Sequence, residues 1–376
     1  MTMKIRIGIT ILLHDKKRLF LSTAGIAFAV MIMFMQIGFF NGINDSQSAI
    51  ARMINADLVL ISTNRTTLNK WNRFDPVSLH KVIAFPEVRE GIPIYKDGTG
   101  LKNPETGQIK RVIVYAYPAT SSAFNLPDMS RRVEDTLKIN GNVLFDRRSR
   151  EIYGDFSPGD TISINNNEFN VSGVVTVGPN LINDGTILMN DGTWIGQGGN
   201  RRPIMSLIRL KEGQDKAKAI ASIKSKLPEE LLAYTPENLA KREVVYMVTN
   251  TPVGAIFGIG LVVSLVIGTI ICYQVLFNEV TDHIPQYATL KAMGFGPRSL
   301  IVIILEQAIA LGIIGFIPGY LVAIGMYDFI DEYTRLLMLL TPERIGVIFI
   351  LTLIMCIFAG MLAVRKVLKV DPAELY

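Results

Sequence analysis

Cysteine, histidine and charge are all scarce in this chain. Its 376 residues include only two cysteines and three histidines, and 19% of them are charged, against about 25% in an ordinary soluble domain. Cys272 and Cys356 both lie inside long apolar runs, which excludes a disulfide framework or a cysteine-based metal site outside the membrane. The histidines are scattered along the chain, so no histidine metal motif is formed.

The motifs of common enzymes are also missing. The sequence contains no G-x-x-x-x-G-K-[ST] phosphate loop, no H-E-x-x-H zinc motif and no G-x-S-x-G nucleophile elbow. The glycine-rich stretch 196–199 lacks the lysine of a phosphate loop, and its composition is typical of a plain surface loop. We therefore predict that this chain is not an enzyme and carries no catalytic residue, cofactor or metal of its own.

Long uncharged runs are the dominant feature that is present. Residues 19–44, 244–278, 307–327 and 345–364 contain no charged side chain. A helix of about 20 mostly apolar residues crosses a hydrocarbon core of about 30 Å. The sequence therefore predicts a membrane protein with four spans.

The basic residues indicate how these spans are oriented. Ten lysines and arginines and five acids flank the predicted spans in the N-terminal segment, the loop 278–298 and the C-terminal tail, whereas the loop 328–343 carries four acids and one base, Arg335. The positive-inside rule then places both termini and the loop 278–298 in the cytoplasm. The net charge of +5 thus marks orientation and does not indicate a nucleic-acid partner.

The first apolar run follows basic residues, as a secretory signal peptide does. Residues 49–51 even form an A-x-A sequence. The uncharged run is, however, much longer than the roughly 7–15 apolar residues of a signal peptide, and the A-x-A sequence lies well beyond it. We interpret the run as an uncleaved signal anchor.

These observations define a fold class, an α-helical membrane protein in which one span precedes and three follow a large α+β external domain. The external domain is expected to have a discontinuous lobe (about 57–125 plus 205–235) and an inserted β-rich lobe (about 140–200), with strands near 57–62 and 111–117, a hairpin over 161–175 and helices near 78–85 and 215–227. The predicted segments are an amphipathic N-terminal segment 1–18, span 19–43, external domain 44–252, span 253–277, coupling loop 278–298, span 299–327, loop 328–343, span 344–364 and tail 365–376.

The loop 278–298 has the most specific pattern. After Pro285, the side chains of Tyr287, Leu290 and Met293 fall on one face of a helix, and Gly294 is a natural stop. Such a short amphipathic helix docks into a groove of another protein in some complexes. It equally suits a helix at the membrane surface that only joins two spans. The pattern alone leaves both alternatives open.

Residues 287–294 (YATLKAMG) resemble the coupling-helix signature of permeases related to the MacB and FtsX proteins, the mechanotransmission type of ABC transporter. The one-plus-three layout and the closing residues 370–374 (VDPAE) are similar to that family as well, over essentially the whole chain. Residues 28–39, 144–149 and 251–257 resemble the DevC branch, permeases of cyanobacterial glycolipid-type exporters. One departure is Gln286, where the family commonly has an acid.

The resemblance implies a permease that exports lipid-like, glycolipid or hydrophobic cargo. Its implied partners are a separate ABC ATPase subunit that holds Mg-ATP, a second permease copy, a periplasmic membrane-fusion adaptor and a TolC-like outer-membrane channel. The implied ATPase contacts are Gln286, Tyr287, Leu290, Lys291, Met293 and Gly294. An FtsX-like transducer that regulates a periplasmic cell-wall hydrolase is the alternative, and a sensor without an ATPase is a third possibility.

Two features inside the spans have their own interpretations. Glu306 is an ionisable group in the third span, where it either pairs or snorkels near the interface or acts as a relay. Small-residue spacings occur at Gly38/Gly42, Gly254/Gly258 and Gly315/Gly319 and permit close helix packing. The dimer that the family resemblance implies makes Gly38 and Gly42 the expected contact between copies.

The orientation can be tested by labelling single cysteines from outside intact cells. Cysteine at Asn166 or Glu332 is expected to react with an impermeant maleimide, whereas cysteine at Asn278 or Lys369 is expected to react only after the membrane is permeabilised, because the positive-inside rule places these positions in the cytoplasm. Labelling of Lys369→Cys in intact cells would overturn the orientation.

Overall fold

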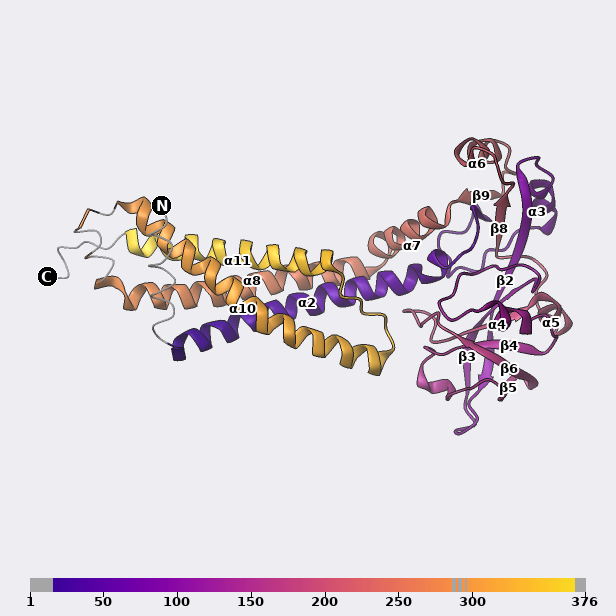
Figure 1. The fold of residues 1–376 in the computed structure, drawn as a ribbon, viewed down its shortest axis with the longest axis horizontal. Helices are drawn as coiled ribbons and strands as arrows, with labels where there is room; N and C mark the ends of the chain where they lie inside the picture. Colours follow the sequence, from indigo (N-terminus) through magenta and orange to yellow (C-terminus); the bar gives the residue numbers. More distant parts are fainter. Residues whose placement is uncertain (1–15, 286–288, 290–292, 295, 369–376) are drawn as a thin grey trace. The chain divides into compact units, whose positions relative to one another are not determined.

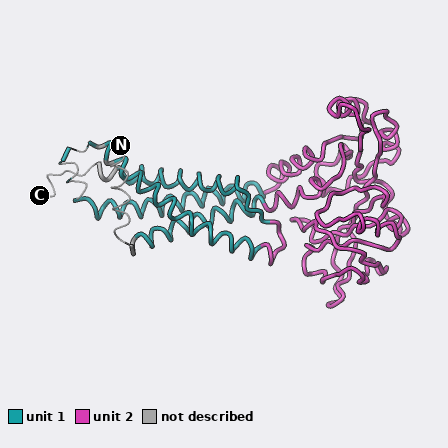
Figure 2. Tube along the Cα trace, in the orientation of Figure 1, with its two compact units in different colours: residues 1–41, 253–330, 338–376 teal, residues 42–252, 331–337 magenta. Residues whose placement is uncertain are grey.

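The computed structural model describes residues 16–285, 289, 293, 294 and 296–368. The chain divides into two compact units, shown in separate colours in Figure 2: a helical unit made of residues 1–41, 253–330 and 338–376, and a second unit made of residues 42–252 and 331–337. We call the second unit the inserted domain. Of the predicted N-terminal segment 1–18, the structure describes only residues 16–18. Of the predicted tail 365–376, it describes only residues 365–368.

Within the part of the chain that the structure describes, four helices are long and apolar enough to cross a membrane, which agrees with the number of predicted spans. They are α2 (Lys16–Arg52), α8 (Pro252–Asp282), α10 (Pro297–Thr334) and α11 (Pro342–Leu368), all labelled in Figure 1. Helices α2 and α10 continue well past the predicted span ends at residues 43 and 327. The prediction stopped where charges begin, but a helix continues through polar residues wherever its backbone hydrogen bonds remain available.

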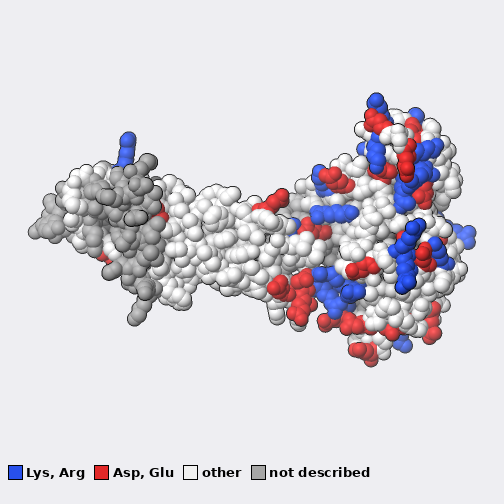
Figure 3. Space-filling model, viewed as in Figure 1, with Lys and Arg blue, Asp and Glu red and all other residues white. Residues whose placement is uncertain are grey.

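The charged side chains are distributed as a bilayer requires. On the face shown in Figure 3, acidic and basic residues gather over the inserted domain, while the spanning helices are nearly free of them. Large apolar side chains such as Ile259, Val263, Leu321 and Ile350 are exposed on these helices. In a membrane protein such side chains face lipid or another subunit instead of water.

The inserted domain is built on a nine-stranded sheet with the order β3-β7-β4-β6-β5-β2-β8-β1-β9. Its strands are β1 (Leu58–Ser62), β2 (Val88–Lys102), β3 (Ile109–Tyr117), β4 (Asn142–Asp146), β5 (Thr161–Ile164), β6 (Asn167–Val175), β7 (Thr186–Asn190), β8 (Met205–Leu210) and β9 (Leu231–Tyr234). Its helices are α3 (Pro76–Ile83), α4 (Arg131–Thr136), the short 3-10 helix η1 (Glu151–Tyr153), α5 (Asp191–Gly196), α6 (Lys216–Ser225) and α7 (Pro236–Asn250).

Strand β2 belongs to both halves of this sheet. Its first half pairs with β8, and its second half pairs with β3 and β5. The mixed lobe consists of β1, β8, β9 and the start of β2, against which α3 and α6 pack through Leu79, Val82, Ala219 and Ile223. The β-rich lobe consists of β3 to β7 and the end of β2. A shared core, to which Ile61, Ile92, Tyr115 and Leu188 all contribute, joins the two lobes.

This arrangement corrects the predicted boundary between the lobes. Strand β3 was expected in the discontinuous lobe, yet it pairs antiparallel with the end of β2 and parallel with β7, so it belongs to the β-rich lobe. The local pattern of β3 shows only that it is a strand. The position of β3 depends on its long antiparallel pairing with the second half of β2, which lies in the β-rich lobe.

The local predictions in this domain are confirmed. Strands β5 and β6 form the expected hairpin, in which Ile164 pairs with Asn167. The two residues between them, Asn165 and Asn166, have φ of 48° and 65°, as a type I′ turn requires. Helix α6 begins after Asp215, whose carboxylate accepts from the Ala217 and Lys218 N–H groups and satisfies backbone donors at the helix start. Other elements of the domain were not predicted, namely strands β2, β4, β7, β8 and β9 and helices α4, α5 and α7.

A buried polar cluster ties α7 to the rest of the inserted domain. Glu243 of α7 is 1% exposed and accepts from the Thr67 hydroxyl at 2.6 Å and from the Leu68 N–H at 2.9 Å. Arg65 donates to the carbonyls of Leu68 and Ile204 at 2.6 and 2.8 Å. The Lys96 Nζ donates to the Leu68 carbonyl at 3.1 Å and lies over the rings of Trp71 and Tyr115. The loop after β1 is thereby held against β2 and α7.

Lys96 predicts a pH dependence of stability. Burial, reinforced by the neighbouring Arg65 charge, lowers the pKa of Lys96 from 10.5 to about 7. Between these values the unfolded chain binds more protons than the folded one, so the free energy of unfolding rises with pH from about 7 to 10. The slope from this one group is at most about 1.4 kcal/mol per pH unit.

We expect Lys96→Met to flatten this slope, whereas Lys102→Met, an exposed position on the same strand, should leave it unchanged. Denaturant unfolding of the full-length protein in detergent, followed by tryptophan fluorescence, measures the effect, because both tryptophans of the chain, Trp71 and Trp194, lie in the inserted domain. An unchanged slope in Lys96→Met would show that Lys96 does not titrate in this range.

Candidate functional site

The loop between α8 and α10 is the first candidate site. Of its predicted contact residues, Gln286, Tyr287, Leu290 and Lys291 lie outside the described residues, while Met293 and Gly294 lie within them. The Met293 N–H donates to the Thr289 carbonyl at 3.0 Å, a helical i to i−4 bond. Gly294 has φ of +90°, the left-handed conformation with which glycine ends helices. The Met293 side chain is 63% exposed, so it is available to a partner.

An apolar cluster holds the helix ends from which this loop emerges. Val280 of α8, Ile303 and Ile304 of α10 and Val364 of α11 are all buried against one another. Close packing of this kind resists independent movement of its members. A force applied to the loop therefore acts on three spanning helices together.

Glu306 of α10 lies two residues beyond this cluster. It is half-buried, and its Oε2 atom is buried without a hydrogen bond from any residue that the structure describes. A carboxylate in such a position is costly unless a cation or proton neutralises it. The two alternatives for Glu306, pairing near the interface and a relay, both remain predictions.

The glycines of the predicted small-residue spacings differ in whether another part of the chain packs against them. A Cβ added at Gly315 or Gly319 of α10 would overlap Ile26, Ala27 or Val30 of α2, and one added at Gly38 would overlap the side chains of Tyr327 and Met338. These glycines allow α2 and α10 of the same chain to approach closely. The Tyr327 hydroxyl strengthens the contact by donating to the Phe34 carbonyl at 2.5 Å.

Gly38 and Gly42 were expected to pack against a second copy, but in the structure both lie against residues of the same chain. Gly38 faces the chain's own α10, and Gly42 lies against Leu336 and Leu337 of the same chain. The sequence spacing correctly indicates close approach of two helices but does not say which two. A Cβ added at Gly258, in contrast, has no atom within 4 Å among the residues described.

Gly258 lines an apolar groove between α2 and α8. The groove has a volume of about 110 Å³ and is lined by Gln36, Ile37 and Phe40 of α2 and by Gly254, Phe257, Gly258 and Leu261 of α8. Of the four spanning helices, α8 has the least buried apolar window, 17% against 50% for α10. The α8 side of the helical unit is thus the most open to lipid or to another protein.

The inserted domain contains a cavity on its β-rich lobe. The cavity, of about 400 Å³, lies between β2, the β5–β6 hairpin and α5, and Asp97, Thr99, Asn165 and Trp194 contribute to its lining. Gly199, of the glycine-rich stretch, packs against the Trp194 ring. Among the described residues, no three His, Cys, Asp or Glu side chains gather as metal ligands would. Both cysteines are buried and unoxidised within spanning helices.

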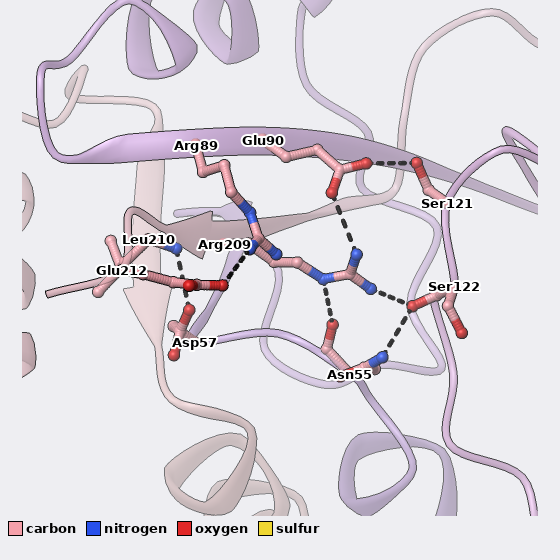
Figure 4. A network of polar contacts seen from close by, with 9 residues as sticks. All are labelled: Asn55, Asp57, Arg89, Glu90, Ser121, Ser122, Arg209, Leu210 and Glu212. Atoms are coloured by element: carbon pink, nitrogen blue, oxygen red, sulfur yellow. Dashed lines mark hydrogen bonds and ion pairs between the residues drawn. The ribbon is translucent and has the colours of Figure 1, made fainter.

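A polar network holds the segment that follows α2 within the inserted domain (Figure 4). Arg209 of β8 donates to the Asn55 carbonyl at 3.1 Å, to Glu90 of β2 at 3.1 Å and to the Ser122 carbonyl. Asn55 lies three residues beyond the end of α2 and also donates to Ser122. A single guanidinium therefore joins the exit of α2 to the central strands of the mixed lobe, with the rigid geometry that arginine provides.

Comparison with known proteins decides the family. The MacB-like periplasmic core domain family matches residues 19–226, and the FtsX-like permease C-terminal family matches residues 258–372. The chain belongs to the MacB/FtsX family of ABC transporter permeases. This confirms the fold class of four spanning helices with a periplasmic domain between the first two, and it places the protein in the inner membrane as a permease component.

Individual relatives are more distant. An uncharacterized ABC transporter permease of Methanocaldococcus jannaschii is 24% identical over 246 residues, which cover 61% of this chain and 58% of the relative. The periplasmic region of MacB from Actinobacillus actinomycetemcomitans has a TM-score of 0.36 at 11% identity and covers 51% of this chain and 94% of that one. The extracellular domain of the transporter YknZ from Gram-positive bacteria has a TM-score of 0.34 at 10% identity, covering 48% and 99%.

Proposed function

We propose that this chain is the membrane subunit of an ATP-driven exporter, in which a separate ATPase binds the loop 278–298 and thereby moves the inserted domain. The observation that carries the proposal is the family match over both parts of the chain, combined with a loop whose described residues end in an exposed Met293 and a helix-ending Gly294. The partner ATPase supplies Mg-ATP, and this chain supplies the mechanical connection.

The proposed movement begins where the ATPase binds the loop 278–298. Movement of the loop acts on α8, α10 and α11 through the cluster around Val280. Helices α2 and α8 continue the movement, because α2 leads directly into the inserted domain and α8 follows directly from α7. Buried ties such as Arg209 and Glu243 keep the domain rigid at these entry points. Cargo then need not pass between the spans.

The proposed cargo is lipid-like, glycolipid or hydrophobic, and it leaves through a periplasmic membrane-fusion adaptor and a TolC-like outer-membrane channel. This part rests on the similarity of residues 28–39, 144–149 and 251–257 to DevC-type permeases. Both termini are proposed to be cytoplasmic, on the basis of the basic residues that flank the spans.

The contact with the ATPase can be tested at Tyr287 and Leu290. If both side chains share the docking face, Tyr287→Ala with Leu290→Ala should release the ATPase or uncouple hydrolysis from export. Truncation of an interface anchor typically costs about 1–2 kcal/mol or more, so ATPase affinity should fall at least about fivefold. Gln286→Glu restores the acid common in the family and should be tolerated.

The matched control is Thr289→Ala, since Thr289 lies between these positions and its hydroxyl donates to its own helix at the Pro285 carbonyl. Co-purification of the ATPase and its cargo-stimulated hydrolysis rate are the measurements. Full binding and export in the double variant would make the loop a simple connector. ATPase binding without any adaptor-dependent export in the wild type would favour the FtsX-like transducer.

We also propose that the transporter contains two copies of this chain that meet along the groove between α2 and α8. The groove is apolar, Gly258 offers open space for a close helix contact, and α8 is the least covered spanning helix. Small residues at such positions drive helix association in membranes, where packing replaces the hydrophobic effect.

Gly258→Leu should therefore block cross-linking between copies in membranes by filling the groove. Gly346→Leu is the control, because Gly346 of α11 likewise has no atom within 4 Å of an added Cβ among the described residues but lies away from the groove residues in sequence. We expect the cross-linked dimer to disappear only in Gly258→Leu. Equal loss in both variants, or in neither, would place the contact between copies elsewhere.

A further inference from the structure

The segment Asp331–Leu337 is counted with the inserted domain, although its neighbours on both sides in sequence belong to the helical unit. It comprises the last turn of α10, which ends at Thr334, and the first residues of the connection to α11. Two arginines, one on each side of the contact, account for its attachment to the β-rich lobe.

Arg335 supplies the first half of the attachment. Its backbone has φ of +55°, and its N–H donates to the Asp331 carbonyl at 2.9 Å, which ends α10 in a left-handed turn. Its guanidinium donates to the carbonyls of Arg147 and Ser149 at 3.0 and 2.8 Å. The carboxylates of Glu151 and Asp155 lie 3.5 and 3.8 Å from the same group.

Arg148 supplies the reciprocal half. From the turn after β4, its guanidinium donates to the Arg335 carbonyl at 3.1 Å and forms an ion pair with the Asp331 carboxylate. The turn is held by the buried Asp146, whose carboxylate accepts from the N–H groups of Arg148, Val177 and Gly178 at 3.1, 2.9 and 3.0 Å. The lobe therefore presents Arg148 from a fixed backbone.

The opposite side of the segment is also in contact within the inserted domain. A Cβ added at Gly42 of α2 would lie 3.2 Å from the Leu337 carbonyl oxygen and 3.4 Å from the Leu336 side chain. The segment is thus packed against α2 through Leu336 and Leu337 and bonded to the β-rich lobe through Asp331 and Arg335. This close approach gives Gly42 a role that needs no second copy.

These bonds differ from an ordinary surface ion pair. The side chains of Arg148, Arg335 and Asp331 are 25%, 23% and 39% exposed, and the two guanidiniums bond to backbone carbonyls in both directions. Hydrogen bonds from charged donors are stronger than neutral ones, and arginine fixes their directions. Several such bonds together fix the position of the segment against the turn after β4, whereas an isolated exposed ion pair contributes little to stability.

We propose that Asp331–Leu337 is a third attachment between the spanning helices and the inserted domain, which stays closed and makes the β-rich lobe follow the connection between α10 and α11. The chain itself supplies the other two attachments, through α2 and through α7–α8. The functional consequence rests on the proposed export function. The attachment itself does not, so it can be tested separately.

Hydrogen–deuterium exchange of the full-length protein in nanodiscs tests the attachment. Arg335→Asn keeps a residue that tolerates positive φ while removing the guanidinium, and Arg148→Gln removes the reciprocal donor. Exchange in peptides that cover residues 331–341 should become about tenfold faster or more in either variant. Arg147→Gln is the control, because Arg147 is exposed and contributes its carbonyl oxygen. Unchanged exchange in both variants would overturn the attachment.

The functional arm uses the same variants in the assembled transporter. With Cys272 and Cys356 replaced by alanine, a short bis-methanethiosulfonate cross-linker should join Arg148→Cys to Asp331→Cys and preserve transport, because the contact is made at the end of the long Arg148 side chain. Arg148→Gln with Arg335→Asn should lower transport and leave ATPase binding intact. Loss of transport on cross-linking, reversed by reduction, would show that the attachment must open and would overturn the proposal. If the wild type binds no ATPase, the export function fails while the exchange result stands.

Discussion

A bilayer offers no water to backbone N–H and C=O groups, and this constraint shapes the rest of the molecule. The chain satisfies it with four long helices whose backbones are bonded internally. Because lipid is as apolar as the side chains, these helices associate through close packing. The glycines Gly315 and Gly319 of α10 supply that packing by admitting Ile26, Ala27 and Val30 of α2.

The inserted domain, in contrast to the spans, is surrounded by water. It has a conventional apolar core, yet its most deeply buried side chains include Arg65, Lys96 and Glu243. Such groups are costly to bury unless they are compensated. Arg65 donates to backbone carbonyls, Lys96 lies over an aromatic ring, and Glu243 accepts from the Leu68 N–H. They occur where α7 meets the loop after β1. Polar bonds of fixed geometry hold α7 and this loop in one arrangement.

The chain passes between the helical unit and the inserted domain at several points in the sequence. Helices α2 and α8 are the obvious attachments, and the cluster around Val280 ties three spanning helices to the loop where an ATPase is proposed to act. The reciprocal bonds of Arg148 and Arg335 add the connection between α10 and α11 to this set. In the proposed mechanism, these attachments transmit movement of the spanning helices to the inserted domain.

The sequence alone determined the features that depend on local composition. Uncharged runs predicted the four spans, the three asparagines 165–167 predicted the hairpin turn, and Asp215 marked the start of α6. These signals are local because a span, a turn and a helix cap each depend on a few adjacent residues. The same reasoning ended α2 and α10 too early, since charges mark the membrane surface and do not mark the end of a helix.

Only the tertiary structure decided which elements meet. The spacing at Gly38 indicated a close contact but not that its neighbours would be Tyr327 and Met338 of the same chain. Strand β3 looked like any strand until its pairing with β2 and β7 placed it in the β-rich lobe. Arg148 and Arg335, far apart in sequence, had no pattern that linked them. Partner choice depends on long-range packing and hydrogen bonding, and a one-dimensional pattern does not contain that information.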